Sequence, residues 1–199
     1  MTLPFCVQTV LRRVRCVAVY LVAVAVVSDG FAMAAPGQLD PTFGVGGRVV
    51  ASNSTGGDTL LSVAIQADDR IILGGGCFYV TFSVMCVSRF QANGQIDTTF
   101  GTGGRVMLPI GTSASAATTI AMQTDGKVVL GVSCYTPGSH PFCMLRLQPD
   151  GSLDQGFGSA GLVTTNLPGG GDIWRVRILP DGRILAIGTC GVGISTQPV

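Results

Sequence analysis

Short runs of apolar residues alternate along this chain with turns that are rich in Gly, Asn and Asp. The runs have the length of strands, and in the best-defined stretch they lie at residues 104–109, 118–123, 127–133 and 142–148. Asp125-Gly126 separates two of these runs, and glycine tolerates the positive φ that a tight hairpin turn needs. The pattern therefore predicts antiparallel strands joined by short turns.

A short motif of an aliphatic residue, aspartate, two variable residues, phenylalanine and glycine recurs in the chain. Its aspartates are Asp40, Asp97 and Asp154, and the interval between them is constant. The strand pattern has the same period, with runs in the first period at 62–66, 70–75 and 85–91. Four strands in a period of about 57 residues predict an all-β fold of tandem four-stranded antiparallel repeats, similar to β-propeller blades. We place the repeats at about residues 38–94, 95–151 and 152–199.

The motif residues have a structural explanation. Phe43, Phe100 and Phe157 can fill the gap between neighbouring sheets, and each aspartate can fix its turn by accepting backbone hydrogen bonds. The alternative is a Ca²⁺ site, which would need six to eight oxygen ligands. No dense run of acidic residues supplies them.

The third repeat contains no counterpart of the last strand of the other two. Propellers usually close with four to eight blades. We therefore expect an incomplete propeller, either as a piece of a longer protein or as one of several chains that complete a ring.

The segment before the first repeat differs in character from the rest. Arg12, Arg13 and Arg15 precede an apolar run at 17–27, and small residues follow at 32 and 34. This order predicts a signal peptide over residues 1–34, and a secreted repeat domain over 35–199 in an extracellular or periplasmic location. The alternative, an uncleaved anchor, would need an apolar run of about 20 residues. We expect no membrane span after cleavage.

The amino-acid composition argues against one class of partner and against helical structure. Beyond residue 34 the charge is nearly balanced, and this argues against a nucleic-acid partner. Glutamate is absent and Lys127 is the only lysine, whereas Asp and Gly are frequent. Because Glu and Lys favour helices and Asp and Gly favour turns, helix is disfavoured.

The cysteines follow the repeat. Cys77 and Cys86 are nine residues apart, as are Cys134 and Cys143, and each lies one period from its counterpart. In an exported protein this pattern predicts the disulfides Cys77–Cys86 and Cys134–Cys143. A metal site is the alternative, although no Cys-x-x-Cys pair is present. Cys190 corresponds to the first cysteine of each pair, and its partner is undetermined.

Few residues of the sequence are candidates for catalysis or for binding a metal or cofactor. His140 is the only histidine, so we predict no catalytic residues, no cofactor and no metal site. A binding or surface-scaffold module fits better, with an unidentified protein or carbohydrate ligand and possible self-association as partners. An extracellular hydrolase or lyase with a site on the propeller face is the alternative. Candidate ligand contacts are the residues that break the repeat: Tyr79, Phe82, Tyr135, His140 and Trp174. For Trp174 a core position is the favoured interpretation, and ligand contact is the alternative.

The repeat resembles the delta-60 repeat family. The similarity lies in residues 39–49, 96–106 and 121–131, the last with Gln123, Asp125-Gly126 and Lys127. The third copy departs from the pattern at Gln155, Gly156 and Ala160. The resemblance implies a β-propeller architecture in a secreted bacterial protein and no assigned catalytic residues.

Overall fold

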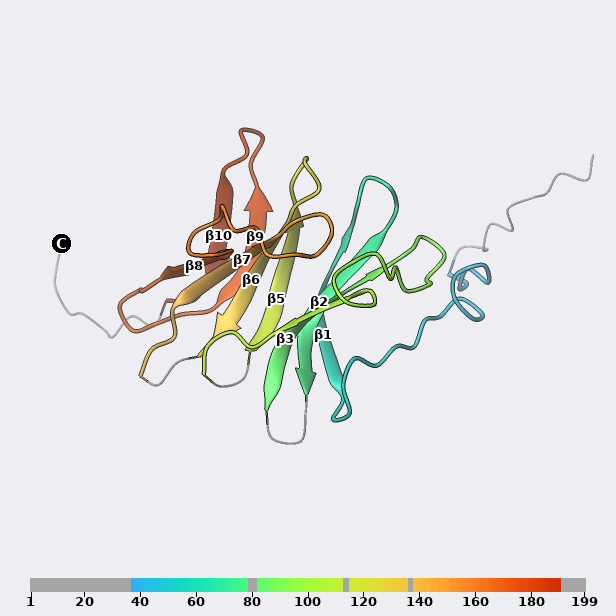
Figure 1. The fold of residues 1–199 in the computed structure, drawn as a ribbon, viewed down its shortest axis with the longest axis horizontal. Helices are drawn as coiled ribbons and strands as arrows, with labels where there is room; N and C mark the ends of the chain where they lie inside the picture. The colour runs from blue at the N-terminus through green and yellow to red at the C-terminus, as the bar shows by residue number, and fades with distance from the viewer. Residues whose placement is uncertain (1–36, 79–81, 113–114, 136–137, 191–199) are drawn as a thin grey trace, which may run out of the picture. The chain divides into compact units, whose positions relative to one another are not determined.

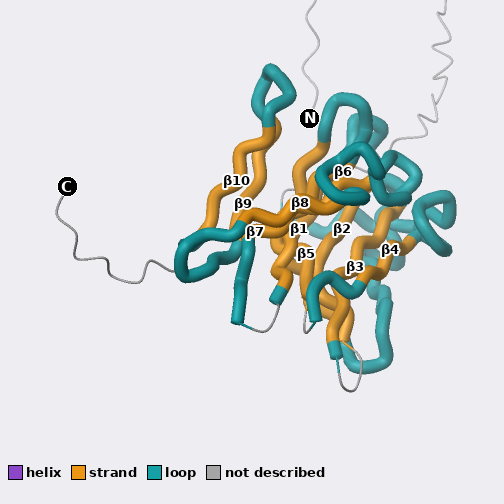
Figure 2. The backbone as a smooth tube through the Cα atoms, turned by 60° about the vertical axis from the view of Figure 1, so that its left-hand side comes forward, coloured by secondary structure: helices purple, strands orange, loops and turns teal. Residues whose placement is uncertain are grey.

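The computed structural model describes residues 37–78, 82–112, 115–135 and 138–190. In these ranges the chain consists of strands and loops alone (Figures 1 and 2). The strands are β1 (Asp58–Ile65), β2 (Ile71–Phe78), β3 (Ser83–Phe90), β4 (Arg105–Leu108), β5 (Ser115–Met122), β6 (Val128–Cys134), β7 (Phe142–Leu147), β8 (Leu162–Thr165), β9 (Ile173–Ile178) and β10 (Ile184–Gly188). The predicted signal peptide, residues 1–34, lies outside the described residues.

The strands form successive antiparallel sheets in chain order. The first sheet has the order β1-β2-β3-β4, the second has the order β5-β6-β7-β8, and β9 pairs with β10 in a third. Every pairing joins strands that are neighbours in the sequence, as expected for chains folded through tight turns. The predicted all-β fold of tandem four-stranded antiparallel repeats is confirmed.

The sheets are out of phase with the sequence motif. β4 follows the motif at Asp97, yet it pairs with β3 of the preceding sheet, with Val106 opposite Val87. β8 pairs with β7 in the same way. The strand that follows each motif therefore completes the previous sheet. Spacing along the chain could not show this, because it does not say which neighbour a strand pairs with. Residues 48–51, the counterparts of β4, form no strand in the described chain.

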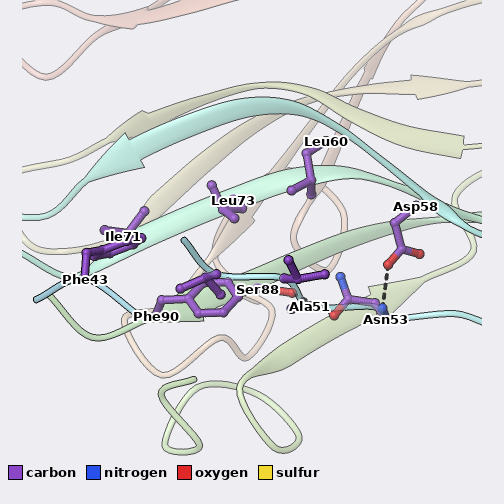
Figure 3. A pocket seen from close by; sticks show the side chains of 11 residues that line it. Phe43, Ala51, Asn53, Asp58, Leu60, Ile71, Leu73, Ser88 and Phe90 are labelled. Carbon is purple, nitrogen blue, oxygen red and sulfur yellow. Dashed lines mark hydrogen bonds between the residues drawn. The ribbon is translucent and has the colours of Figure 1, made fainter. Parts of the chain in front are cut away.

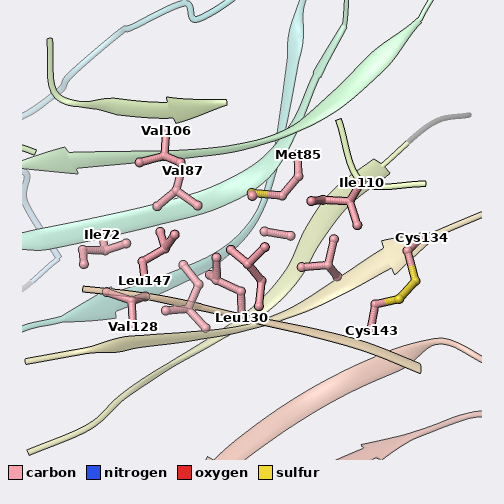
Figure 4. Close-up of a cluster of buried hydrophobic side chains, with 14 of the residues drawn as sticks. Ile72, Met85, Val87, Val106, Ile110, Val128, Leu130, Cys134, Cys143 and Leu147 are labelled. Atoms are coloured by element: carbon pink, nitrogen blue, oxygen red, sulfur yellow. A yellow bond between two sulfur atoms is a disulfide. The ribbon is translucent and has the colours of Figure 1, made fainter. Parts of the chain in front are cut away.

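The first and second sheets pack face to face. Ile72, Met85 and Val87 of the first sheet lie in one buried cluster with Val128 and Leu130 of the second (Figure 4). β5 lies against β1, β2 and β3. The largest hydrophobic core of the described chain is therefore an interface between two repeats.

Glycine permits this close packing. A Cβ atom at Gly74 would lie 2.9 Å from Cδ1 of Ile120, and at Gly131, the counterpart in the next sheet, 2.7 Å from Cγ2 of Ile173. Both distances are shorter than non-bonded carbon atoms tolerate. The second and third sheets thus repeat the contact, with Val129 against Ile173 and Val176.

The second and third copies of the motif each hold an ion pair between the motif aspartate and an arginine. The carboxylate of Asp97 accepts a 2.7 Å hydrogen bond from Nε of Arg89 and further bonds from the amide and hydroxyl of Thr99. The Arg89 guanidinium lies 4.7 Å from the ring centre of Phe100, which is fully buried. The turn-forming role predicted for the aspartate and the gap-filling role predicted for Phe100 are both seen here.

The third motif repeats the arrangement. Nε of Arg146 donates a 2.7 Å hydrogen bond to Asp154, and its guanidinium lies 4.4 Å from the ring centre of Phe157. In the first motif, the described residues give the Asp40 carboxylate hydrogen bonds from Thr42 but no ion pair, and both residues are exposed.

Both predicted disulfides are present. Cys77–Cys86 joins β2 to β3, and Cys134–Cys143 joins β6 to β7, so each bond ties neighbouring strands of a single sheet. All four residues are buried, whereas Cys190 is free and exposed. Paired disulfides are typical of proteins from oxidising compartments.

We predict that the double variant Cys77→Ala/Cys86→Ala has a free energy of unfolding lower by about 2 to 3 kcal/mol, because the bond closes a short loop in the unfolded chain. Urea denaturation measures this change. The control variant Cys190→Ser should match the parent, and an unchanged midpoint for the double variant would contradict the prediction.

We predict that Asp97→Asn destabilises the fold by about 3 kcal/mol, because Arg89 would remain buried without its counter-charge. The matched control is Asp40→Asn, which removes the same motif position where no arginine is paired. Thermal and urea unfolding compare the two variants. Equal losses would show that the turn, and not the ion pair, accounts for the effect.

Acid should weaken the fold through the same carboxylates. Burial acts to raise the pKa of Asp97, but hydrogen bonds from Thr99 and the charge of Arg89 outweigh it, so the pKa lies below its ordinary value of 3.8. The stability that this group contributes is present above pH 3.8 and is lost as the pH falls through the lower folded-state pKa. We expect a free energy of unfolding that declines below this pH, and less steeply in Asp97→Asn. Parallel acid profiles of parent and variant would disprove this.

Candidate ligand site

The first strands of the three sheets share an irregularity at corresponding positions. The pairing register shifts between Leu60 and Ser62 in β1, and between Ala117 and Thr119 in β5. In the third sheet it shifts where Ile187 and Gly188 face β9. The bulged residues are Leu61, Thr118 and Trp174. A bulge leaves one residue out of the ladder and redirects its side chain.

The three bulges line one surface hollow of about 200 Å³, which we call the bulge groove. It is bounded by residues of β1, β5 and β9: Leu61, Ser62, Val63, Thr118, Thr119, Ile120, Trp174, Arg175, Val176 and Arg177. Three consecutive repeats therefore contribute equivalent segments to a single surface.

Hydrogen bonds across the sheets hold the bulge groove together. The amide of Ile120 donates to Oγ of Ser62 at 3.1 Å, and the amide of Val176 donates to Oγ1 of Thr119 at 3.4 Å. Oγ1 of Thr118 donates to the carbonyl of Ile173 at 2.6 Å. Hydroxyl groups of β1 and β5 thus link the three strands, with Ser62 and Thr119 at equivalent positions.

The third sheet departs from this pattern. Trp174 is 67% exposed, so the core position considered for it from the sequence is wrong. Arg175 occupies the position of Ser62 and Thr119, and Arg177 follows on the same strand; both are exposed. Within the described residues neither arginine forms an ion pair. One end of the bulge groove therefore presents an indole and two guanidinium groups to solvent.

A second aromatic group lies at the loop before β7. Tyr135 and His140 make an edge-on contact with ring centres 4.4 Å apart. Burial raises the pKa of Tyr135, as do the charge of Asp172 and its hydrogen bond. The amide of Gly171 donates a 2.6 Å bond to the carbonyl of His140. The loop leading to Trp174 is thereby anchored on this pair.

The remaining predicted contacts are separate. Phe82 is exposed in the loop before β3 and does not line the bulge groove, and Tyr79 lies outside the described residues. Across the described ranges, no three His, Cys, Asp or Glu side chains cluster as metal ligands would. No helix in those ranges is long and apolar enough to span a membrane.

Trp174 stands out in the sequence as the only tryptophan, but the bulges that orient it were not predicted. Leu61 and Thr118 carry no distinctive chemistry, and a bulge depends on pairing between strands. The available clue was the spacing, since Leu61 and Thr118 are one motif period apart and Trp174 falls just short of the next period.

Comparison with known proteins gives one finding about the family. Residues 66–100 and 123–157 match the family described as "Domain of unknown function (DUF5122) beta-propeller". The starting points of the two segments are separated by the same interval as the motif aspartates. No curated protein matches the chain. The match supports a family of propeller-like repeats, in agreement with the tandem sheets.

Proposed function

We propose that this chain is a secreted, non-catalytic repeat protein of the delta-60 type that binds carbohydrate at the bulge groove. The observation that carries the proposal is the exposed Trp174, set on a bulge beside Arg175 and Arg177. A large apolar ring costs free energy when it faces water, so a ring displayed in this way suits a partner that covers it.

The chemistry of the groove favours an acidic sugar. An indole face packs against the apolar face of a sugar ring, and arginine binds carboxylates through paired, charge-assisted hydrogen bonds. Trp174 and Arg177 supply both elements within one hollow. The ligand class that fits is an oligosaccharide of uronic acids.

Export is part of the proposal. The basic and apolar order before residue 35 supports a cleaved leader, and two buried disulfides are typical of an oxidising location. An extracellular hydrolase or lyase remains the alternative hypothesis. It would need a general base at the groove, whereas His140 packs edge-on against Tyr135.

We predict that oligogalacturonate changes the intrinsic fluorescence of the exported protein, because Trp174 is its only tryptophan. Neutral cello-oligosaccharides of the same length should bind more weakly. By calorimetry, Trp174→Ala should weaken binding about tenfold, the equivalent of roughly 1.4 kcal/mol of lost ring contact, and Trp174→Phe should retain most of it.

Two arginine variants provide the matched comparison. Arg177→Ala should weaken binding of the acidic sugar, whereas Arg183→Ala, an exposed arginine paired with Asp181 at the β9–β10 turn, should not. Equal binding of acidic and neutral sugars, or an undiminished affinity in Trp174→Ala, would overturn the proposed site.

A further inference from the structure

One face of the first sheet is apolar, and along β1 no described part of the chain covers it. We define the outer face as Leu60, Val63 and Ile65 of β1, Ile71 and Leu73 of β2, and Phe90 of β3. The three β1 residues are more than half exposed, at 51%, 61% and 67%, whereas Ile71 and Leu73 are half-buried and Phe90 is buried beneath the segment that contains Phe43 and Val49. A contiguous apolar surface of this kind marks an interaction site on a folded protein.

The repeat shows what such a face does elsewhere in the chain. The counterparts of Leu60, Val63, Ile71 and Leu73 in the second sheet are Ala117, Ile120, Val128 and Leu130, and all four are buried against the first sheet. The third-sheet counterparts Ile173 and Val176 are buried against the second sheet. In both cases the neighbouring sheet covers the positions that the first sheet leaves open.

The outer face is uneven in shape as well as apolar. A hollow of about 410 Å³ lies beside Leu60, between β2 and β3 and the preceding segment that contains Phe43 and Val49 (Figure 3). Asp58 lies at its rim and is hydrogen-bonded to the amide of Asn53 and the hydroxyl of Ser54. The side chains of β1 thus form a ridge next to a depression, with no unpaired charge in the middle.

In another copy of the chain, the exposed face of the third sheet would be the expected partner of the outer face, because neighbouring repeats pack in this order. Its residues fit the outer face poorly. On this face, Ile187 occupies the position that Gly74 and Gly131 hold in the first and second sheets, where the next sheet packs closely. A Cβ atom at either glycine would already be too close to the next sheet. Arg175 replaces the hydroxyl that accepts a hydrogen bond from the next sheet, and a guanidinium only donates. Head-to-tail stacking of copies is therefore disfavoured.

We propose that the outer face binds the outer face of a second copy of this chain in a two-fold symmetric dimer. Two-fold symmetry brings the ridge of each copy opposite the depression of the other, so one surface provides both halves of the contact. Apolar side chains meet apolar side chains, and the Asp58 carboxylates stay at the rim. This inference can be tested apart from the carbohydrate proposal, because Leu60 belongs only to the outer face and Trp174 only to the bulge groove, although Val63 lies in both.

The test compares two arginine substitutions at positions of matched exposure. In a Cys190→Ser background, which removes thiol-linked dimers, sedimentation equilibrium should show the exported chain dimerising. Leu60→Arg, at a residue that is 51% exposed, should weaken dimerisation at least a hundredfold. Ile187→Arg, at a residue that is 53% exposed on the third sheet, should leave it unchanged. Circular dichroism confirms that both variants are folded.

Other outcomes overturn the proposal. A parent chain that remains monomeric at every accessible concentration shows that no second copy covers the face. Loss of association in both variants, with recovery on mixing them, indicates head-to-tail stacking instead. As a second measurement, Ile65→Arg in the same background should weaken dimerisation as Leu60→Arg does. Unchanged dimerisation in both variants would also disprove the two-fold contact.

Discussion

The packing of one sheet on the face of the next is the interaction on which this structure depends. No sheet has a core of its own, because a single layer of strands has nothing to cover its apolar sides. Val128 and Leu130 are buried only because Ile72, Met85 and Val87 lie over them. The close approach needs glycine at position 74 and again at 131, where a larger side chain would push the sheets apart. Stability in such an array is shared between neighbours and does not reside in separate repeats.

Buried charge complements this apolar packing at the edge of the sheets. Arg89 and Asp97 are both almost fully buried, and each has several hydrogen-bonding partners. A buried pair contributes little compared with an apolar substitute, but it is costly to break and accepts few alternative geometries. The motif therefore determines where each turn sits relative to the sheets, and this explains why its aspartate recurs with so little variation in spacing.

Much of the fold could be predicted from the sequence because it depends on local patterns, namely apolar runs of strand length and the spacing of the cysteines. The runs predicted at 104–109 and 142–148 correspond to β4 and β7 within two residues, and both disulfides follow from cysteine spacing. Local patterns do not encode pairing, so the assignment of β4 to the preceding sheet was not predictable. The bulge groove was missed for the same reason, since Leu61 and Thr118 acquire their orientation only when the strands pair. Trp174 could be selected as a candidate ligand contact only because it is the single tryptophan of the chain.

The offset between motif and sheet also bears on how such chains can grow. A duplicated segment that spans one full period and begins at the motif carries a strand that belongs to the sheet before it, as Arg105–Leu108 does for the first sheet. Each added unit is therefore joined to its predecessor by main-chain hydrogen bonds as well as by side-chain packing. Unequal recombination at any point in the period yields a chain whose internal sheets are still four strands wide. Tandem amplification can thus change the number of repeats without requiring a new boundary to evolve.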